Sequence, residues 1–422
     1  MRDLIKFPFG QKEVIVRIPK SNLLQVLKMK SLKGLANEAE GIKKALQNPI
    51  NTLPLNEVVK PHSKVVIVIS DKTRPVPNRK IVSCILDELY NLAVRDIKIL
   101  VALGMHTPNT KIELKQMLGK KILEKIKVLN HEPLNKKKIK YIGDTSRGTP
   151  VEVNTLVTNA DVKIITGYIE PHEFAGFTGG RKSILPGVSG INTIKWNHRP
   201  EFFEHFKAKI GILNGNPIHE DMVEAARMVG IDFMVNVALN KRKEITKVVA
   251  GDFLEAYYNG VEFYKHYATA KVNQQADIVI TSSGYPLDRD FYQSVKSIIA
   301  AELIVKKGGT IILLTESRDG IGPHLFSYWL KKASSLNDLI EKIKREDFKP
   351  EFDHCYLLAR VLKKCKLIVV SSQPQLKRIK FLTVVSSIKT ALNMAFRSQE
   401  RCAEVIALPY ATGVIPKLTR NK

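Results

Sequence analysis

The sequence predicts an α/β protein with two domains whose sheets are mostly parallel. Three observations support this: the length of the chain, its short β-branched runs, and the longer helical patterns between them. With 422 residues, the chain exceeds what one ordinary core accommodates. Strands that alternate with amphipathic segments are typical of βαβ units. A hydrophobic content of 44%, without low-complexity tracts, fits a globular protein.

Six β-branched runs predict buried strands. They are Lys64–Ser70, Ile97–Leu103, Val162–Thr166, Ala276–Thr281, Thr310–Leu314 and Leu367–Ser371. Amphipathic stretches at Arg79–Leu92 and Ser294–Val305 predict helices between them, and Gly308-Gly309 is expected to separate the second helix from the next strand.

A domain boundary is expected near residue 270. The polar segment Lys271–Gln275 precedes a new strand–loop–helix–strand pattern. This predicts a first domain over residues 1–270, which carries the loops rich in histidine and lysine, and a second over 271–422. One more strand is predicted at Glu404–Tyr410, and it could belong to either domain.

Composition argues against several classes of protein. No apolar run approaches the roughly 18–20 residues needed to cross a bilayer. The first residues carry an acid and lack an apolar core, so they do not form a signal peptide and a cytoplasmic location is expected. The four cysteines are scattered without a CxxC pair, which argues against a zinc–thiolate site and a disulfide framework.

The net charge of +26 raises the question of nucleic-acid binding. The lysines are spread along the whole chain, aromatic residues make up only 7%, and no nucleic-acid-binding motif is present. Solvated basic faces are therefore favoured over a nucleic-acid groove, and no nucleic-acid partner is expected. Such a chain attracts anions, including a carboxylate substrate or a phosphorylated cofactor.

Most chemically informative residues follow predicted strands, where open α/β sheets bind ligands. After the first strand, Asp71 can accept hydrogen bonds and Arg74 can clamp a carboxylate, although the segment also fits a polar turn stopped by Pro75. After the second strand, His106 lies on a loop ahead of a capping box at Thr110. Imidazole titrates near neutral pH and can accept a proton, but a loop histidine is often only a surface residue.

The segment after the third strand, residues 167–187, is rich in glycine and contains His172 and Lys182. Its Gly179-Gly180 step would let the backbone approach a bound group, and successive amides there could hold a phosphate. The Walker spacing is absent. Lys182 could be a charge partner or a covalent attachment point.

Two further segments carry candidates. His198, ahead of Pro200, is a possible metal ligand, with a surface histidine as the alternative. Gln293 and Lys296 lie three residues apart and so share a helix face, which is often simply solvated.

Taken in order, five motifs resemble those of the nickel-dependent lactate racemase family. They are D-x-T-R-P from Asp71, G-x-H-x-P-x-T from Gly104, P-H-x-x-A-G-F-T-G-G-x-K-x-x-x-P-G from Pro171, N-H at Asn197, and Y-Q-x-x-K from Tyr292. The match runs from about Asp71 to Asp319, and the closing Ala407-Leu408-Pro409-Tyr410 fits as well.

The resemblance implies a racemase or epimerase that inverts the α-carbon of a 2-hydroxy acid. Its cofactor would be a nickel-pincer nucleotide, a pyridinium-3-thioamide-5-thiocarboxylic acid mononucleotide supplied by cofactor-biosynthesis proteins. It further implies attachment to Lys182, nickel ligation by His198, and bases at His106 and His172. Cofactor contacts are expected from Asp71, Thr73, Thr178, Gly179 and Gly180, and substrate contacts from Arg74, Gln293 and Lys296. The family fold places this site in a cleft between two α/β domains.

The chemistry agrees with this implication. The α-proton of a 2-hydroxy acid is poorly acidic, so taking the hydrogen as hydride avoids a carbanion if an electron sink is close. One histidine then takes the hydroxyl proton, and hydride return to the other face needs a second base on the opposite side.

Two positions depart from the family pattern. Thr107 stands where arginine is expected, and residues 352–356 lack the tryptophan expected in the site. Both departures would alter the pocket, so the expected substrate is lactate or a larger or more polar relative.

Three alternatives remain. A zinc hydrolase built on the three histidines would need an acidic base nearby, and no H-E-x-x-H spacing supports it. A basic nucleic-acid-binding protein would not need the histidines. A relative that has lost activity and only binds a metabolite is disfavoured by the intact histidines and lysine.

Overall fold

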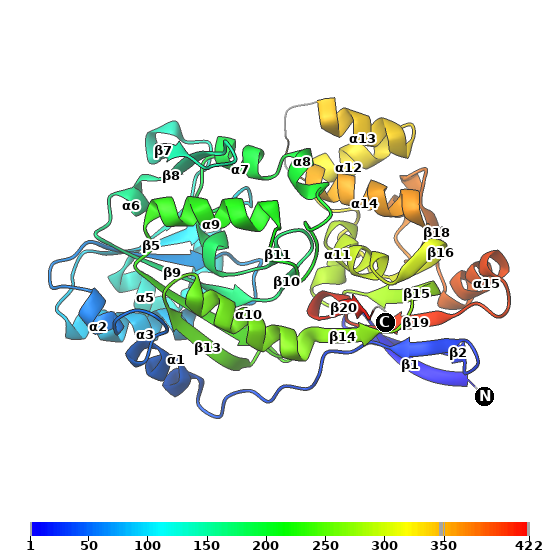
Figure 1. Cartoon of the computed structure of the whole chain (residues 1–422), viewed down its shortest axis with the longest axis horizontal. Helices are drawn as coiled ribbons and strands as arrows, with labels where there is room; N and C mark the ends of the chain where they lie inside the picture. Colours follow the sequence, from blue (N-terminus) through cyan, green and yellow to red (C-terminus); the bar gives the residue numbers. More distant parts are fainter. Residues whose placement is uncertain (1, 346–348, 350, 420–422) are drawn as a thin grey trace. The chain divides into compact units, whose positions relative to one another are not determined.

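The chain forms two compact units in the computed structural model, which describes residues 2–345, 349 and 351–419 (Figure 1). The continuous unit is Ser31–Tyr267, and the discontinuous unit combines Met1–Lys30 with Ala268–Lys422. The boundary lies close to the expected position at residue 270. The assignment of residues 1–30 to the first domain was wrong, because these residues supply a strand and a hairpin to the discontinuous unit.

The continuous unit contains a six-stranded sheet in which only the edge strand β13 is antiparallel to its neighbour. In spatial order the strands are β13 (Ile245–Gly251), β12 (Phe233–Leu239), β9 (Val162–Ile169), β4 (Val65–Ser70), β5 (Ile97–Ala102) and β6 (Lys127–Asn130). β4 and β9 are almost entirely buried, as expected for parallel strands covered on both faces.

Ten helices belong mainly to this unit. They are α1 (Glu38–Gln47), α2 (Leu55–Val58), α3 (Asn78–Asn91), α4 (Lys111–Leu118), α5 (Lys120–Lys125), α6 (Thr155–Thr158), α7 (Ile191–Asn197), α8 (Pro200–Phe203), α9 (Pro217–Val229) and α10 (Glu255–Ala268). Two hairpins complete it: β7 (Ile139–Asp144) with β8 (Pro150–Asn154), and β10 (Pro171–His172) with β11 (Gly176–Phe177). One face of the sheet packs against the apolar sides of α1 and α3.

The strand order creates a ligand-binding position. From β4 the chain moves outward through β5 and β6, and then returns to β9 on the other side of β4. The connections therefore diverge at the carboxyl ends of β4 and β9. Open α/β sheets bind ligands at such a reversal of strand order.

The discontinuous unit contains a second six-stranded sheet, which is entirely parallel. Its order is β18 (Thr383–Val385), β17 (Lys366–Val370), β16 (Val305–Leu314), β15 (Ala276–Ser282), β19 (Val405–Leu408) and β3 (Leu23–Val26). Its helices are α11 (Phe291–Glu302), α12 (His324–Lys332), α13 (Leu336–Arg345), α14 (Phe352–Lys364) and α15 (Ile388–Gln399). A short parallel pair joins β14 (Thr269–Val272) to β20 (Ile415–Leu418).

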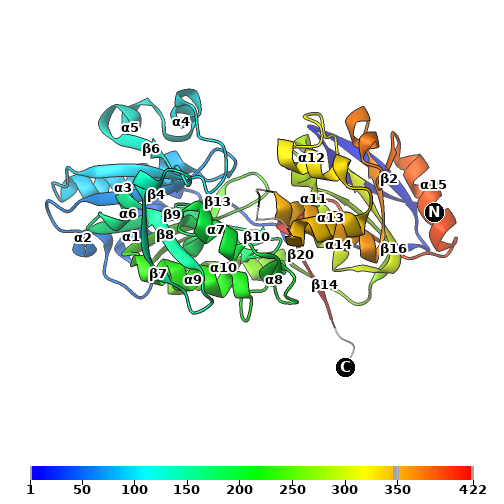
Figure 2. The ribbon, with the colours of Figure 1, turned by 90° about the horizontal axis from the view of Figure 1, so that it is seen from above.

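The start of the chain is part of this second core. The antiparallel hairpin of β1 (Arg2–Phe9) and β2 (Lys12–Pro19) buries Phe7 and Ile18 against strand residues such as Ile280 and Ile312. In both views the dark blue hairpin lies beside the strands of this sheet (Figures 1 and 2). The predicted strand at Glu404–Tyr410 is β19, and it belongs to the same sheet.

The predicted fold class is confirmed: both units are α/β with mostly parallel sheets. All six predicted strands are present within a few residues of their expected bounds. The expectation for Gly308-Gly309 was wrong, because both glycines lie inside β16 rather than ahead of it. Across the described ranges, no helix combines the length and apolarity needed to span a bilayer.

A buried histidine links three segments of the continuous unit. His131 follows β6, is 1% exposed, and lies with Nε2 2.9 Å from the carbonyl oxygen of Ser189. Its Nδ1 accepts from the Asn154 amide at 3.0 Å. Burial lowers the pKa of His131 to about 4, although the Ser189 carbonyl and the charge of Glu132 partly oppose this. The ring is therefore neutral in the folded protein at neutral pH.

We expect the protein to lose stability as the pH falls from about 6.5 to about 4. In this window the unfolded chain protonates His131 and the folded chain does not, so the free energy of unfolding falls by up to roughly 3 kcal/mol. Urea denaturation at pH 7.5 and pH 5 measures the change. His131→Gln should show a smaller difference between the two pH values, and an unchanged difference would contradict this role.

Candidate active site

A pocket of about 80 Å³ lies in the continuous unit at the carboxyl ends of β4, β5 and β9. It is at the position that the strand order favours for a ligand. Six of the predicted site residues line it: Asp71, Arg74, His106, Thr178, Gly179 and Lys182. Three loops that are far apart in the sequence thus contribute to one pocket.

Asp71 and His106 form a close pair in this pocket. The His106 Nδ1 lies 2.6 Å from the Asp71 Oδ2. Burial alone would raise the pKa of the Asp71 carboxyl, but the hydrogen bond and charge of His106 lower it. The Arg74 charge and the Thr73 hydroxyl act in the same direction and bring the pKa to about 2. Asp71 is therefore ionised at neutral pH.

The state of Asp71 determines the tautomer of His106. A carboxylate can only accept hydrogen bonds, so the His106 Nδ1 carries a proton and donates it. In the neutral ring, Nε2 then bears the lone pair and can act as a base. The side chain of His106 is 43% exposed, so this nitrogen has room to meet a ligand. This is the arrangement of an oriented general base.

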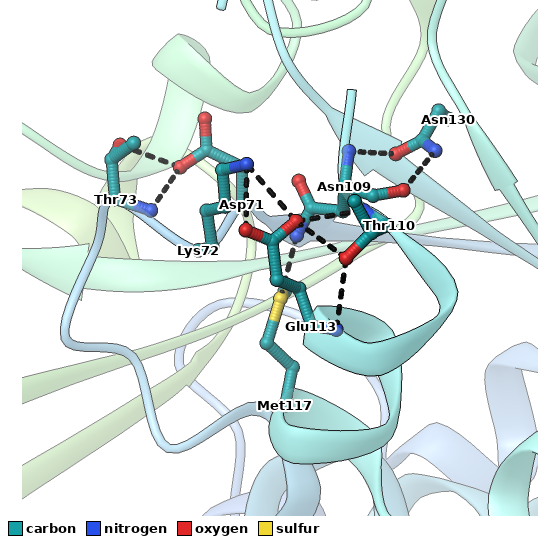
Figure 3. A network of polar contacts seen from close by, with 8 residues as sticks. All are labelled: Asp71, Lys72, Thr73, Asn109, Thr110, Glu113, Met117 and Asn130. Carbon is teal, nitrogen blue, oxygen red and sulfur yellow. Dashed lines mark hydrogen bonds and ion pairs between the residues drawn. The ribbon is translucent and has the colours of Figure 1, made fainter. Parts of the chain in front are cut away.

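The loops that carry this pair are fixed by polar contacts (Figure 3). The Asp71 Oδ1 accepts from the backbone N–H and the hydroxyl of Thr73, at 2.8 and 2.6 Å. Thr110 and Glu113 form the predicted capping box at the start of α4. Lys72 donates to Glu113 at 2.8 Å and so joins the loop after β4 to α4.

Asn109 is fixed from the neighbouring strand β6. The Asn130 side chain accepts from the Asn109 N–H at 3.1 Å and donates to the Asn109 carbonyl at 2.9 Å (Figure 3). The loop from His106 to Thr110 is thus anchored at its carboxyl-terminal end, and the histidine is presented from a fixed backbone.

Tyr168 is a pocket residue that the motifs did not single out. It lies near the end of β9, and its hydroxyl donates to the Glu170 carboxylate at 3.0 Å. Burial raises the pKa of Tyr168, the charge of Glu170 raises it further, and the charge of Arg74 opposes the rise. The phenol therefore stays neutral. Its position at a strand end was the available signal, but the predicted strand stopped at Thr166.

The glycine turn serves packing more than anion binding. The Gly180 N–H donates to the Asn236 side chain at 3.0 Å, so this amide is not available to a phosphate. Gly179 has φ +84°, and a Cβ there would lie 2.4 Å from the Asn236 Oδ1. The Thr178 hydroxyl donates to the Tyr168 carbonyl at 2.8 Å. Of the predicted phosphate contacts, the Gly180 amide is therefore already used inside the protein.

The ring of Phe174 contacts three candidate residues of the continuous unit, which are His172, Lys182 and His198. It meets the His172 ring edge-on with centroids 4.6 Å apart, and the His198 ring edge-on at 5.4 Å. The Lys182 Nζ lies over the same ring, 5.8 Å from its centre. His172, Lys182 and His198 therefore surround one buried phenylalanine. Sequence reasoning missed Phe174, because an aromatic residue in a glycine-rich loop has no distinctive spacing.

His198 is oriented as a metal-binding histidine would be. It caps the end of α7, is 6% exposed, and its Nδ1 lies 3.1 Å from the carbonyl oxygen of Ile194. A carbonyl only accepts, so Nδ1 carries the proton and Nε2 has the lone pair. Histidines that ligate metals commonly donate their second ring nitrogen to a backbone carbonyl in this way.

His172 is more deeply enclosed than His106. It is 8% exposed, its Nδ1 accepts from the Ala175 N–H at 3.4 Å, and the Glu173 Oε2 lies 3.4 Å from the same nitrogen. Both histidines expected to act as bases therefore have a carboxylate oxygen near Nδ1. It is the Asp71 Oδ2 at 2.6 Å for His106 and the Glu173 Oε2 at 3.4 Å for His172.

We expect Phe174→Leu to lower the free energy of unfolding. The leucine keeps the site apolar but loses two edge-on ring contacts, with His172 and His198, each worth about 0.5–1.5 kcal/mol. Urea denaturation of the variant and the wild type measures the change. An unchanged free energy of unfolding would show that these ring contacts do not stabilise the site.

Two predicted residues belong to the discontinuous unit. Gln293 and Lys296 lie one turn apart on α11, and the Gln293 N–H donates to the capping Asp290 at 2.7 Å. Residues 352–356, where the family pattern has a tryptophan, form the first turn of α14. There the buried His354 ring stacks on the Tyr292 ring at 4.2 Å.

Family comparisons agree with the arrangement of these motifs. The model for the lactate racemase N-terminal domain matches residues 9–211, and that for the lactate racemase C-terminal domain matches residues 271–416. A lactate racemase from Thermoanaerobacterium thermosaccharolyticum is 36% identical over 420 residues, covering 97% of this chain and 98% of the relative. The chain belongs to the lactate racemase family.

One further relative and two solved structures are also similar to this chain. A lactate racemase from Lactiplantibacillus plantarum is 34% identical over 98% of this chain and 99% of its own length. The lactate racemase apoprotein structure from Thermoanaerobacterium thermosaccharolyticum matches with a TM-score of 0.93 at 35% identity, over 98% of this chain and all of that one. A Thermotoga maritima protein shares the fold, with a TM-score of 0.70 at 18% identity over 92% of this chain and all of its own. The expected family is confirmed, and the chain is an isomerase of the lactate racemase type.

Proposed function

We propose that this enzyme inverts the α-carbon of a 2-hydroxy acid, either lactate or a larger relative, with a nickel-pincer nucleotide attached to Lys182. The observation that carries the proposal is the pocket in which His106, oriented by ionised Asp71, lies with Arg74 and Lys182. Membership of the lactate racemase family gives the reaction class, and the geometry supports the roles proposed for the pocket residues.

His106 would take the hydroxyl proton of one enantiomer through Nε2. Its Nδ1–H stays bonded to Asp71, whose carboxylate stabilises the imidazolium that forms. Inversion needs a second acid–base group for the opposite face of the substrate, and His172 is the proposed group. Its near-complete burial limits exchange of its proton with water.

Arg74 would bind the substrate carboxylate. It lines the pocket and lies close enough to Asp71 and Tyr168 for its charge to affect both of their pKa values. A guanidinium can hold a carboxylate through two parallel hydrogen bonds, which fixes the direction of the α-carbon. Lys296 and Gln293 are proposed as further substrate contacts from α11.

The residues present fit the proposed cofactor. Lys182 lines the pocket and would hold the nucleotide. His198, whose Nδ1 lies at the Ile194 carbonyl, would bind nickel through Nε2. Asp71, Thr73, Thr178 and Gly179 remain proposed contacts of the nucleotide. When bound, the cofactor would supply a hydride acceptor beside the α-carbon.

The donor set also argues against a zinc hydrolase. Such a site needs about three protein ligands with an open position for water. Within the described residues, no three histidine, cysteine, aspartate or glutamate side chains come together to hold a metal ion. His198 would therefore hold nickel together with ligands that the proposed cofactor would supply.

The test is to express the chain with the proteins that make the cofactor, and then to measure intact mass, nickel content and inversion of chiral 2-hydroxy acids. Lactate would be compared with longer and more polar relatives. A mass increase, bound nickel and inversion are expected together. Cofactor-loaded protein that inverts no 2-hydroxy acid would overturn the proposed reaction.

An α-deuterated substrate distinguishes hydride transfer from proton abstraction. Hydride transfer within the site would leave the deuterium in the inverted product, whereas a carbanion would exchange it with water. Retention of the label in ordinary water is expected, and its complete loss would overturn the proposed role of the cofactor.

A further inference from the structure

Arg181 has an unusual environment for a charged residue. It lies next to Lys182 and is 1% exposed. Its Nη1 donates to the carbonyls of Phe177 at 2.8 Å and Gly179 at 3.1 Å, and its Nη2 donates to the carbonyl of Ala175 at 2.7 Å. All three carbonyls therefore come from one short segment, 175–179.

The charge of Arg181 is balanced by dipoles and not by an acid. In the described part of the chain it forms no ion pair; the Tyr257 ring lies 4.7 Å away, and the Tyr257 hydroxyl accepts from Nη1. His219 lies nearby, and its pKa is lowered to about 2 by burial and by the charge of Arg181, so it adds no charge. A buried cation of this kind depends on the groups that replace water around it, and here these are the three carbonyls and Tyr257.

Segment 175–179 joins two proposed functional residues. His172 precedes it, and Lys182 follows it directly after the arginine. We propose that Arg181 is a positioning residue that holds segment 175–179 in one conformation and thereby fixes His172 and Lys182. Rotating any of the three carbonyls away would leave part of the guanidinium unsatisfied, so the segment resists movement. The inference rests on the proposed function for the roles of His172 and Lys182.

Hydrogen exchange of the cofactor-free protein tests this without any activity. In Arg181→Gln the amides of residues 177–180 should exchange about tenfold faster or more, because hydrogen bonds to a charged group are lost. Two of these amides report directly, since Thr178 donates to the Glu170 carbonyl and Gly180 donates to Asn236. Amides of β4 and β12 should keep their wild-type rates.

Two further variants distinguish a positioning role of Arg181 from a general loss of folding. Tyr257→Phe removes one acceptor and leaves the three carbonyl bonds, so a smaller increase is expected in the same amides. Arg360→Gln breaks a partly exposed ion pair with Glu302 in the discontinuous unit and should leave residues 177–180 unchanged. If both Arg181→Gln and Tyr257→Phe leave these amides unchanged, or speed exchange equally through the whole continuous unit, the positioning role is refuted.

Kinetics of the loaded enzyme provide a second readout. Arg181→Gln should lower kcat about tenfold or more, because the substitution would displace the reacting groups. KM should stay within about twofold, because Arg74, the proposed ligand of the substrate carboxylate, is unchanged. Arg181→Lys, which keeps the charge, should recover part of kcat. A change in KM alone would contradict the proposal. Wild-type enzyme without racemase activity would overturn the proposed function, while the exchange experiment would still decide the role of Arg181.

Discussion

Replacing His106 with glutamine is expected to lower kcat about 10²–10⁴-fold, the usual contribution of a general base. Glutamine can still donate to Asp71 but cannot take a proton from the substrate. The 43% exposed side chain contributes little to the core, so the melting temperature should hardly change. Nickel content and intact mass should match those of the wild type, because the cofactor is proposed to be held by Lys182 and His198.

The matched control is His266→Gln, which changes an exposed histidine on α10 and should leave kcat unaltered. A companion variant, Asp71→Asn, should also lower kcat, because an amide can stabilise the wrong His106 tautomer and cannot offset an imidazolium charge. Wild-type activity in His106→Gln would remove this residue from the mechanism.

Replacing Lys182 with alanine is expected to abolish retention of the proposed nucleotide cofactor. Intact mass should show no increase, nickel should fall to background, and racemisation should be lost. The fold should survive, since Lys182 is only partly buried and its contact with the Phe174 ring is worth about 0.5–1 kcal/mol.

Lys195→Ala provides the control for this experiment. Lys195 lies on α7, three positions ahead of His198, and has no proposed contact with the cofactor. It should retain the mass increase and the nickel. Full activity in Lys182→Ala would overturn the attachment, whereas nickel that remains bound without the mass increase would show that the nucleotide is held without a covalent bond.

The sheets and the pocket loops could be predicted because their signals are local. Runs such as Val65–Ser70 are apolar and β-branched throughout, and parallel strands bury both faces. Candidate residues after β4, β5 and β9 converge because the carboxyl ends of parallel strands share one edge of the sheet. The capping box at Thr110 also formed as its spacing predicts.

Features that depend on distant partners could not be predicted. The Gly179-Gly180 turn is typical of an anion-binding loop as long as its amides are free. The Gly180 N–H instead donates to the side chain of Asn236, which lies on β12 and is far away in the sequence, so this hydrogen bond could not be predicted. Nothing near Arg181 in the sequence shows that its partners are the carbonyls of its own loop. Residues 1–30 were misplaced for the same reason, since β3 pairs with β19 from the far end of the chain.

That last pairing has a consequence for synthesis on the ribosome. β3 lies at the edge of its sheet with β19 as its neighbour, so residues 23–26 have no strand to join until residue 408 has emerged. All strands of the continuous unit are synthesised well before residue 408, so this unit can fold before β3 has a neighbouring strand. Completion of this sheet therefore depends on β19, and a chain cut short before it would leave β3 and one edge of β15 without the strand that pairs with both.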